Sequence, residues 1–214
     1  MRRVAVIDYG MGNLRSVSKA LEAVSEDMAE VLVTSEPEKI LSASHIVFPG
    51  VGAIRDCISE LSRLGLDDVV RESAKTKPFL GICLGMQALL THSEENNGVP
   101  ALGIVPGEVK RFANPLMAGS EKLKVPHMGW NRVHQTGEHP LWQDIPQDSR
   151  FYFVHSYYVV PADSAVTAAI SHYPDDFTVA LKQENVFAAQ FHPEKSQHAG
   201  LQLLKNFVNW DGQC

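Results

Sequence analysis

The chain has 214 residues, 44% of them hydrophobic and 21% charged, so it is long enough to bury a sizeable core as one domain over 1–214. Its net charge of −6 argues against a nucleic-acid or membrane surface, and no stretch approaches the roughly 18 apolar residues of a membrane span, so a cytoplasmic protein is expected. Three widely spaced cysteines form no CxxC pair, and no histidine or acidic cluster has metal-ligand spacing, so we expect neither a metal nor another cofactor.

Short apolar runs alternate with helical patterns through the first half of the chain. This βαβ order favours a parallel sheet with helices on both faces. The predicted strands are 4–8, 31–34, 46–48 and 79–82, and the predicted helices are 14–24, 54–64, 66–75 and 86–90.

The second half changes to strand-like runs and closes with a helix. The runs are 107–112, 129–134, 150–160, 165–171, 177–181 and 186–191, and the helix is 197–210. The last two runs are joined through 182–185 and are expected to form a hairpin. The sequence therefore predicts an α/β, flavodoxin-like fold with a mixed, mostly parallel sheet, flanked by helices, and an antiparallel C-terminal part.

Cys83 stands where an apolar run ends and an amphipathic stretch begins, with Gly81 and Gly85 two residues to either side. This is the pattern of a nucleophile elbow, a strained strand-to-helix turn that presents a side chain to a cleft. The positive end of the helix dipole favours a thiolate by only about 0.3–1 kcal/mol. A histidine is therefore expected nearby.

His192 is the best of nine histidines for that role, because it ends the apolar run 186–191 and is followed by Pro193. Glu194 comes two residues later, and in an extended segment its carboxylate would point to the same side as the imidazole. Cys83, His192 and Glu194 are therefore predicted to form a Cys-His-Glu triad.

Two glycine-containing loops follow predicted strands. Gly50 and Gly52 flank Val51, and the backbone N–H groups of this loop, with that of Leu84, are predicted to form an oxyanion hole. The loop 9–13 lacks the complete spacing of a phosphate-binding loop and is expected to be a structural turn or an interface loop.

Three other residues are expected to be structural. Cys57 shares helical spacing with hydrophobic residues and is predicted to lie in the core. His45 and His155 lie within strand-like runs and are expected to be packed or hydrogen-bonded. Cys214 is read as a tail residue.

Three motifs, 48–52, 81–87 and 191–194, resemble in order and spacing those of the class I glutamine amidotransferases. The resemblance spans nearly the whole chain. It implies that Cys83 attacks the side-chain amide of glutamine, that His192 transfers protons and that Glu194 orients the imidazole. It also implies that Gln87 and the backbone around Ser156 and Tyr157 hold the amino-acid end of glutamine, with help from Glu95.

Three further stretches, 8–13, 126–131 and 195–196, resemble one branch of that family, the glutaminase subunits of histidine biosynthesis. The resemblance implies a heterodimer in which ammonia passes to a separate cyclase subunit with a (β/α)₈ barrel. Asn13, Trp130 and Lys195 belong to these stretches and are the predicted interface and coupling residues.

Three alternatives stay open at this point. The chain could serve another synthase, of the anthranilate or guanylate type. It could be a cysteine or ester hydrolase that uses the same elbow on free substrates. It could also be a non-catalytic flavodoxin-like module that binds phosphate through 10–13.

Overall fold

Five parallel strands form the centre of the computed structural model, which describes residues 1–213. In spatial order they are β2 (Ala29–Thr34), β1 (Arg2–Ile7), β3 (His45–Gly50), β4 (Phe79–Cys83) and β16 (Val186–Ala189). Strands β3, β4 and β16 are buried along their whole length, as parallel strands covered on both faces require.

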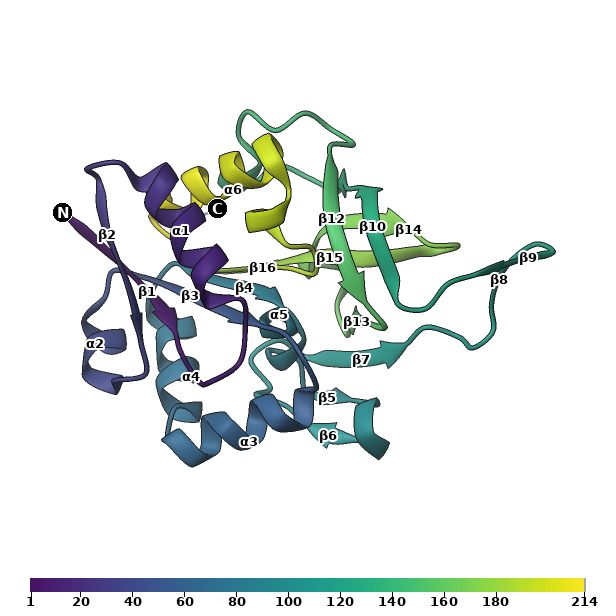
Figure 1. The fold of residues 1–214 in the computed structure, drawn as a ribbon, viewed down its shortest axis with the longest axis horizontal. Helices are drawn as coiled ribbons and strands as arrows, with labels where there is room; N and C mark the ends of the chain where they lie inside the picture. The colour runs from purple at the N-terminus through teal and green to yellow at the C-terminus, as the bar shows by residue number, and fades with distance from the viewer. Residues whose placement is uncertain (214) are drawn as a thin grey trace.

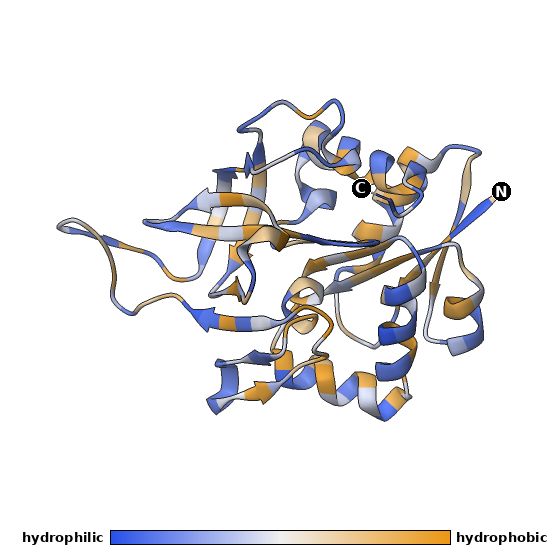
Figure 2. Cartoon of the chain, turned by 180° about the vertical axis from the view of Figure 1, so that it is seen from behind, coloured by the Kyte–Doolittle hydropathy of each residue, from blue (hydrophilic) through white to orange (hydrophobic). Residues whose placement is uncertain are grey.

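Helices cover both faces of this sheet (Figure 1). On one face lie α1 (Leu14–Ser25) and α6 (Gln197–Asn209), and on the other lie α2 (Pro37–Ser42), α3 (Ile54–Leu64), α4 (Asp67–Thr76) and α5 (Leu84–Ala88). Alternate residues of β1 divide between the two apolar cores, Val4 and Val6 toward α1 and Ala5 and Ile7 toward α3. Figure 2 shows hydrophobic residues concentrated on the central strands and hydrophilic ones spread over the outer helices.

Beyond β16 the sheet becomes largely antiparallel. It continues through β15 (Asp176–Gln183), β13 (Tyr157–Pro161), β7 (Gly107–Arg111), β5 (His92–Ser93) and β6 (Val99–Pro100), and β14 (Thr167–His172) with β11 (His134–Gln135) branches from β15. Strands β15 and β16 form the expected hairpin, in which Gln183 pairs with Val186. The predicted α/β class with a mixed sheet is confirmed.

The run 150–160, predicted as one strand, is two strands of different sheets. β12 (Arg150–His155) pairs with β10 (His127–Arg132) in a separate two-stranded sheet, and β13 joins the main sheet after a break at Ser156. The break at Ser156 contains no glycine, proline, asparagine or aspartate, and apolar and aromatic residues lie on both sides of His155 and Ser156, so the sequence carries no strong turn signal there. The predicted strand 129–134 was also wrong in its bounds, since β10 begins at His127 and ends at Arg132.

Several short elements had no signal in the sequence. They are α2, the pair β5 and β6, and the protruding hairpin of β8 (Leu116–Ala118) and β9 (Glu121–Leu123), each too short to show a period. The helix predicted over 86–90 begins earlier, directly after Cys83, and spans five residues.

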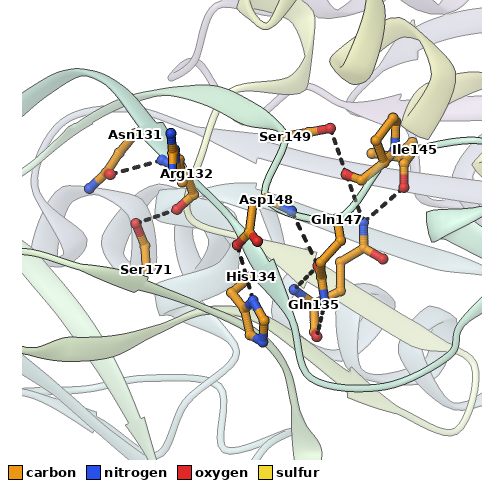
Figure 3. Close-up of polar contacts among 10 residues, drawn as sticks. Asn131, Arg132, His134, Gln135, Ile145, Gln147, Asp148, Ser149 and Ser171 are labelled. Carbon is orange, nitrogen blue, oxygen red and sulfur yellow. Dashed lines mark hydrogen bonds and ion pairs between the residues drawn. The ribbon is translucent and has the colours of Figure 1, made fainter.

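Polar contacts pin the loop before β12 to β11 (Figure 3). Nε2 of Gln135 donates to the Ile145 carbonyl at 3.1 Å, and Nε2 of Gln147 donates to the Gln135 carbonyl at 2.9 Å. His134 Nδ1 lies 3.0 Å from Oδ1 of Asp148. These contacts fix where β12 begins, and β12 in turn supports the site described below.

Other structural expectations can be checked against the fold. Cys57 is fully buried in the core, and His45 is buried with its Nε2 2.8 Å from the Trp210 carbonyl oxygen, so both predictions are confirmed. Cys214 lies outside the described residues. Over 1–213, every helix is too short or too polar to cross a membrane.

Candidate active site

Cys83 ends β4 in a strained backbone conformation, with φ of 55° and ψ of −109°. Leu84 begins α5 at once, so the chain reverses from strand to helix around the cysteine. A Cβ on Gly85 would lie 1.9 Å from the Phe48 carbonyl oxygen, which allows only glycine at this position without a backbone shift. The predicted nucleophile elbow is therefore present.

The segment that carries His192 emerges beside the one that carries Cys83, because β16 pairs with β4 in parallel, with Ala189 opposite Ile82. Residues that follow the two strands meet at the same edge of the sheet. Nδ1 of His192 lies 2.9 Å from Oε1 of Glu194, and their side chains are 2% and 1% exposed. The segment forms a 3-10 turn over Pro193–Lys195 rather than the extended chain we predicted.

The backbone around His192 is held by β12. The His192 N–H donates to the Tyr152 carbonyl at 2.9 Å. Oγ of Ser196 donates to the His192 carbonyl at 2.6 Å and accepts from the Tyr152 N–H at 3.0 Å. These three bonds leave the imidazole little freedom to move away from the cysteine.

Opposing influences act on the His192 imidazole. Burial lowers its pKa, but Cys83 and Glu194 together outweigh burial and raise the pKa to about 10. Among the described atoms, its Nε2 has no hydrogen-bond partner within normal geometry, although Cys83 is close enough to act on its charge. A charged imidazole at this position can deliver a proton to a leaving group.

A cavity of about 330 Å³ opens at this edge of the sheet. Its lining combines residues from the loop 50–52, from the segments that carry Cys83 and His192, and from the β12–β13 break, with Glu95 and Pro126. The lining residues are Val51, Gly52, Cys83, Leu84, Gln87, Glu95, Pro126, Val154, His155, Ser156, Tyr157 and His192. The structure thus brings the sequence-predicted oxyanion and substrate residues together around the cysteine. Their individual roles stay predictions.

Two predicted residues also have structural partners. Oε2 of Glu95 accepts from the Ile54 N–H at 3.0 Å and so satisfies a free donor at the start of α3. Gly52 has a φ of 99°, a value that favours glycine, and it lies against the side chain of Met11. The loop 9–13 therefore supports the loop 50–52 from outside the cavity.

Sequence reasoning missed Gln190 and the part that His155 plays at the cavity. Nε2 of Gln87 donates to the Tyr157 carbonyl at 3.2 Å and to Oε1 of Gln190 at 2.9 Å, and Nε2 of Gln190 lies 3.6 Å from Sγ of Cys83. The available signal was a lone polar residue inside the apolar run 186–191.

His155 is buried and hydrogen-bonded, as predicted, and it also lines the cavity. Its Nδ1 donates to the Tyr157 carbonyl at 2.8 Å, and its Nε2 accepts from Nδ1 of His127 at 2.9 Å. Nε2 of His127 accepts from Asn131 at 3.2 Å. Burial lowers the pKa of His127 to about 4 and that of His155 to about 3, so both rings are neutral at pH 7.

This pair makes the protein sensitive to acid. The unfolded chain protonates both rings near pH 6.5 and the folded chain does so only near pH 3–4, so stability is lost as the pH falls through this window. We expect each ring to remove about 1.4 kcal/mol of unfolding free energy per pH unit. His127→Phe keeps a ring against Tyr173. Its unfolding free energy, measured by urea unfolding at several pH values, should change with pH less steeply than that of the wild type, by about that amount per pH unit between pH 6 and 5. An unchanged slope would contradict the assignment.

The three predicted coupling residues lie outside the cavity lining. Nζ of Lys195 lies 5.7 Å from the centre of the Tyr152 ring, and the Trp130 and Tyr152 rings are 6.2 Å apart. Tyr152, which sequence reasoning missed, thus connects Trp130 with Lys195. Asn13 precedes α1, where its carbonyl accepts from the Val17 N–H at 3.1 Å.

Comparisons with known proteins agree with this geometry. The family model described as glutamine amidotransferase class-I matches residues 5–210. The imidazole glycerol phosphate synthase subunit HisH of Nitrosococcus oceani is 60% identical over 212 residues, covering 99% of each chain. The protein of the same name from Pseudomonas putida is 58% identical over 213 residues and the whole of both chains. Among solved structures, one described as PurLQS from Thermotoga maritima has a TM-score of 0.73 at 17% identity, covering 97% of this chain and 98% of its own.

Proposed function

This chain belongs to the class I glutamine amidotransferases, and on that premise we propose that it is the glutaminase subunit of imidazole glycerol phosphate synthase. The observation that carries the proposal is full-length identity of 57–60% to proteins of that name. It is supported by a cavity lined by Cys83 and by His192, whose Nδ1 is paired with Glu194. These relatives favour this reading over a synthase of the anthranilate or guanylate type. Residues 1–214 would act as one glutaminase domain.

In the first half of the reaction, Sγ of Cys83 attacks the side-chain amide carbon of glutamine. The negative charge that develops on the amide oxygen is stabilised by backbone N–H groups of Leu84 and of the loop that holds Val51 and Gly52. His192 gives a proton to the amide nitrogen, the carbon–nitrogen bond breaks and ammonia leaves. A thioester of glutamate remains on Cys83.

In the second half, water replaces ammonia. His192, now neutral, takes a proton from the water as its oxygen attacks the thioester carbon. The carbon–sulfur bond breaks, glutamate leaves and the Cys83 thiolate is restored beside the protonated imidazole. Glu194, 2.9 Å from Nδ1, keeps the imidazole oriented through both steps.

Gln87, Glu95 and the backbone of Ser156 and Tyr157 line the cavity and would hold the amino and carboxylate groups of glutamine. Both contacts of Gln87 Nε2 are already made within the protein, so its Oε1 is the atom left for a donor such as the substrate ammonium.

The relatives are named as subunits, and the proposed partner of this chain is a cyclase subunit with a (β/α)₈ barrel that consumes the ammonia. Asn13, Trp130 and Lys195 are the proposed contact and coupling residues. Trp130 is 43% exposed, a large apolar surface that a partner would bury.

The proposed function is tested by mixing the chain with a candidate cyclase and its nucleotide substrate. We expect glutamine to support synthesis of the imidazole product by the wild-type complex. The Cys83→Ala complex should lose synthesis with glutamine but keep it with ammonia at high pH, because ammonia is the only species handed over. Loss of both activities would mean that Cys83 is needed for assembly, and glutamate formation without any cyclase product would point to another synthase.

A further inference from the structure

Gln190 directly follows β16 and is fully buried. Its Nε2 lies 3.6 Å from Sγ of Cys83 and donates a hydrogen bond to it, while its Oε1 accepts from Nε2 of Gln87 at 2.9 Å. Gln190 has no role in the reaction steps proposed for Cys83, His192 and Glu194, although its amide contacts the reacting sulfur.

The orientation of the Gln190 amide is fixed by a neighbouring group that can only accept. The Tyr157 carbonyl oxygen accepts, so the Gln87 atom 3.2 Å from it is the amide nitrogen. That nitrogen also faces Gln190, so the Gln190 atom toward it is the oxygen. The Gln190 nitrogen therefore faces the sulfur. This assignment of the amide nitrogen and oxygen follows from the hydrogen-bond partners alone.

The same carbonyl is anchored a second time. Nδ1 of His155 donates to the same Tyr157 oxygen at 2.8 Å. With two donors on it, the Tyr157 carbonyl is a fixed end point for the row formed by Gln87 and Gln190. The row ends at Cys83. The sulfur is therefore contacted by Gln190, whose own amide is held in place by Gln87.

We infer that Gln190 is a further catalytic residue, which donates an N–H···S hydrogen bond to the Cys83 thiolate and keeps the sulfur aimed into the cavity; this rests on the proposed glutaminase function. A hydrogen bond to an ionised acceptor is stronger than one to a neutral acceptor, so the contact favours the nucleophilic form. Because an amide is uncharged, Gln190 does this without competing with His192 for protons.

Two substitutions separate the contact with sulfur from the contact with Gln87. Gln190→Met removes both contacts at similar volume. Gln190→Glu keeps an oxygen that can accept from Gln87 but replaces the NH₂ that faces the sulfur. The matched control is Gln183→Met, a half-buried glutamine on β15 whose amide contacts the Ile104 carbonyl instead.

The measurements are the rate of Cys83 alkylation by iodoacetamide between pH 5 and 10 in the isolated chain, and glutamine hydrolysis by the complex with the cyclase. Loss of a hydrogen bond to a charged group should slow alkylation at pH 7 about ten- to a hundredfold in both Gln190 variants. Their alkylation profiles should move to higher pH, and kcat for glutamine should fall more than KM rises. Gln183→Met should match the wild type.

Two results would overturn the inference. If Gln190→Glu alkylates like the wild type, Gln190 acts only by holding Gln87. If the melting temperature of the Gln190 variants falls while their alkylation profiles match that of the wild type, the role of Gln190 is structural. If Gln190→Met fails to fold, the alkylation profile of Gln190→Glu decides. Failure of the proposed function would look different, as a wild-type complex that forms no glutamate.

Discussion

Replacing Cys83 by Ala should reduce glutamine hydrolysis by about 10⁴-fold or more and abolish labelling by a glutamine-like alkylating reagent. Without the sulfur no thioester forms, and the remaining oxyanion donors and substrate contacts cannot supply a nucleophile. Glutamate release and the mass of the labelled protein measure the two effects. The fold should survive, because alanine fits wherever cysteine does.

The matched control is Cys57→Ala. Cys57 is fully buried in the core, and burial raises the pKa of its thiol to about 12, so it should neither react with the reagent nor contribute to hydrolysis. Wild-type protein should therefore take up label at Cys83 and not at Cys57. Label that persisted in Cys83→Ala and vanished in Cys57→Ala would refute the elbow assignment.

Gly85→Ala should damage stability and reactivity together. The added Cβ would lie 1.9 Å from the Phe48 carbonyl oxygen and 2.9 Å from its carbon, so β3 and α5 must separate. Overpacking of this kind costs about 1–3 kcal/mol or more, and here both clashing atoms belong to the backbone. We expect a loss at the upper end of that range, measured by urea unfolding, and slower alkylation of Cys83.

Gly137→Ala provides the comparison, because its Cβ would meet only Nζ of Lys182 at an ordinary 3.6 Å. Its unfolding free energy should stay within about 0.5 kcal/mol of the wild type. Equal effects of the two substitutions would show that the close approach of Phe48 to Gly85 is not what holds the elbow.

Features encoded by short local patterns could be predicted from the sequence. The elbow needs an apolar run and two glycines around Cys83, and the hairpin of β15 and β16 needs two runs and a short turn. His192 could be found because it ends an apolar run and is followed by Pro193. Each of these signals lies within one short stretch of the chain, and the longest is the hairpin over 177–191.

Features that depend on contacts between distant segments could not be predicted. Gln190 contacts Cys83 only because β16 lies beside β4. His127 likewise contacts His155 only because β10 pairs with β12. The break at Ser156 likewise reflects the sheets on either side rather than the residue itself. In these cases tertiary structure supplies partners for side chains whose local sequence gives no hint of them.

The direct pairing of β4 with β16 has an evolutionary consequence. Cys83 and His192 are far apart in the chain, yet each lies at or just beyond the end of one of two paired strands, which are about 4.8 Å apart as in any sheet. Everything from α5 to β15 is inserted between these two strands, including the protruding β8–β9 hairpin and the surface that carries Trp130. Selection can therefore remodel the outer parts of that insert for a new ammonia acceptor, while the parts that line the cavity, such as Leu84 and Tyr157, are kept for glutamine hydrolysis.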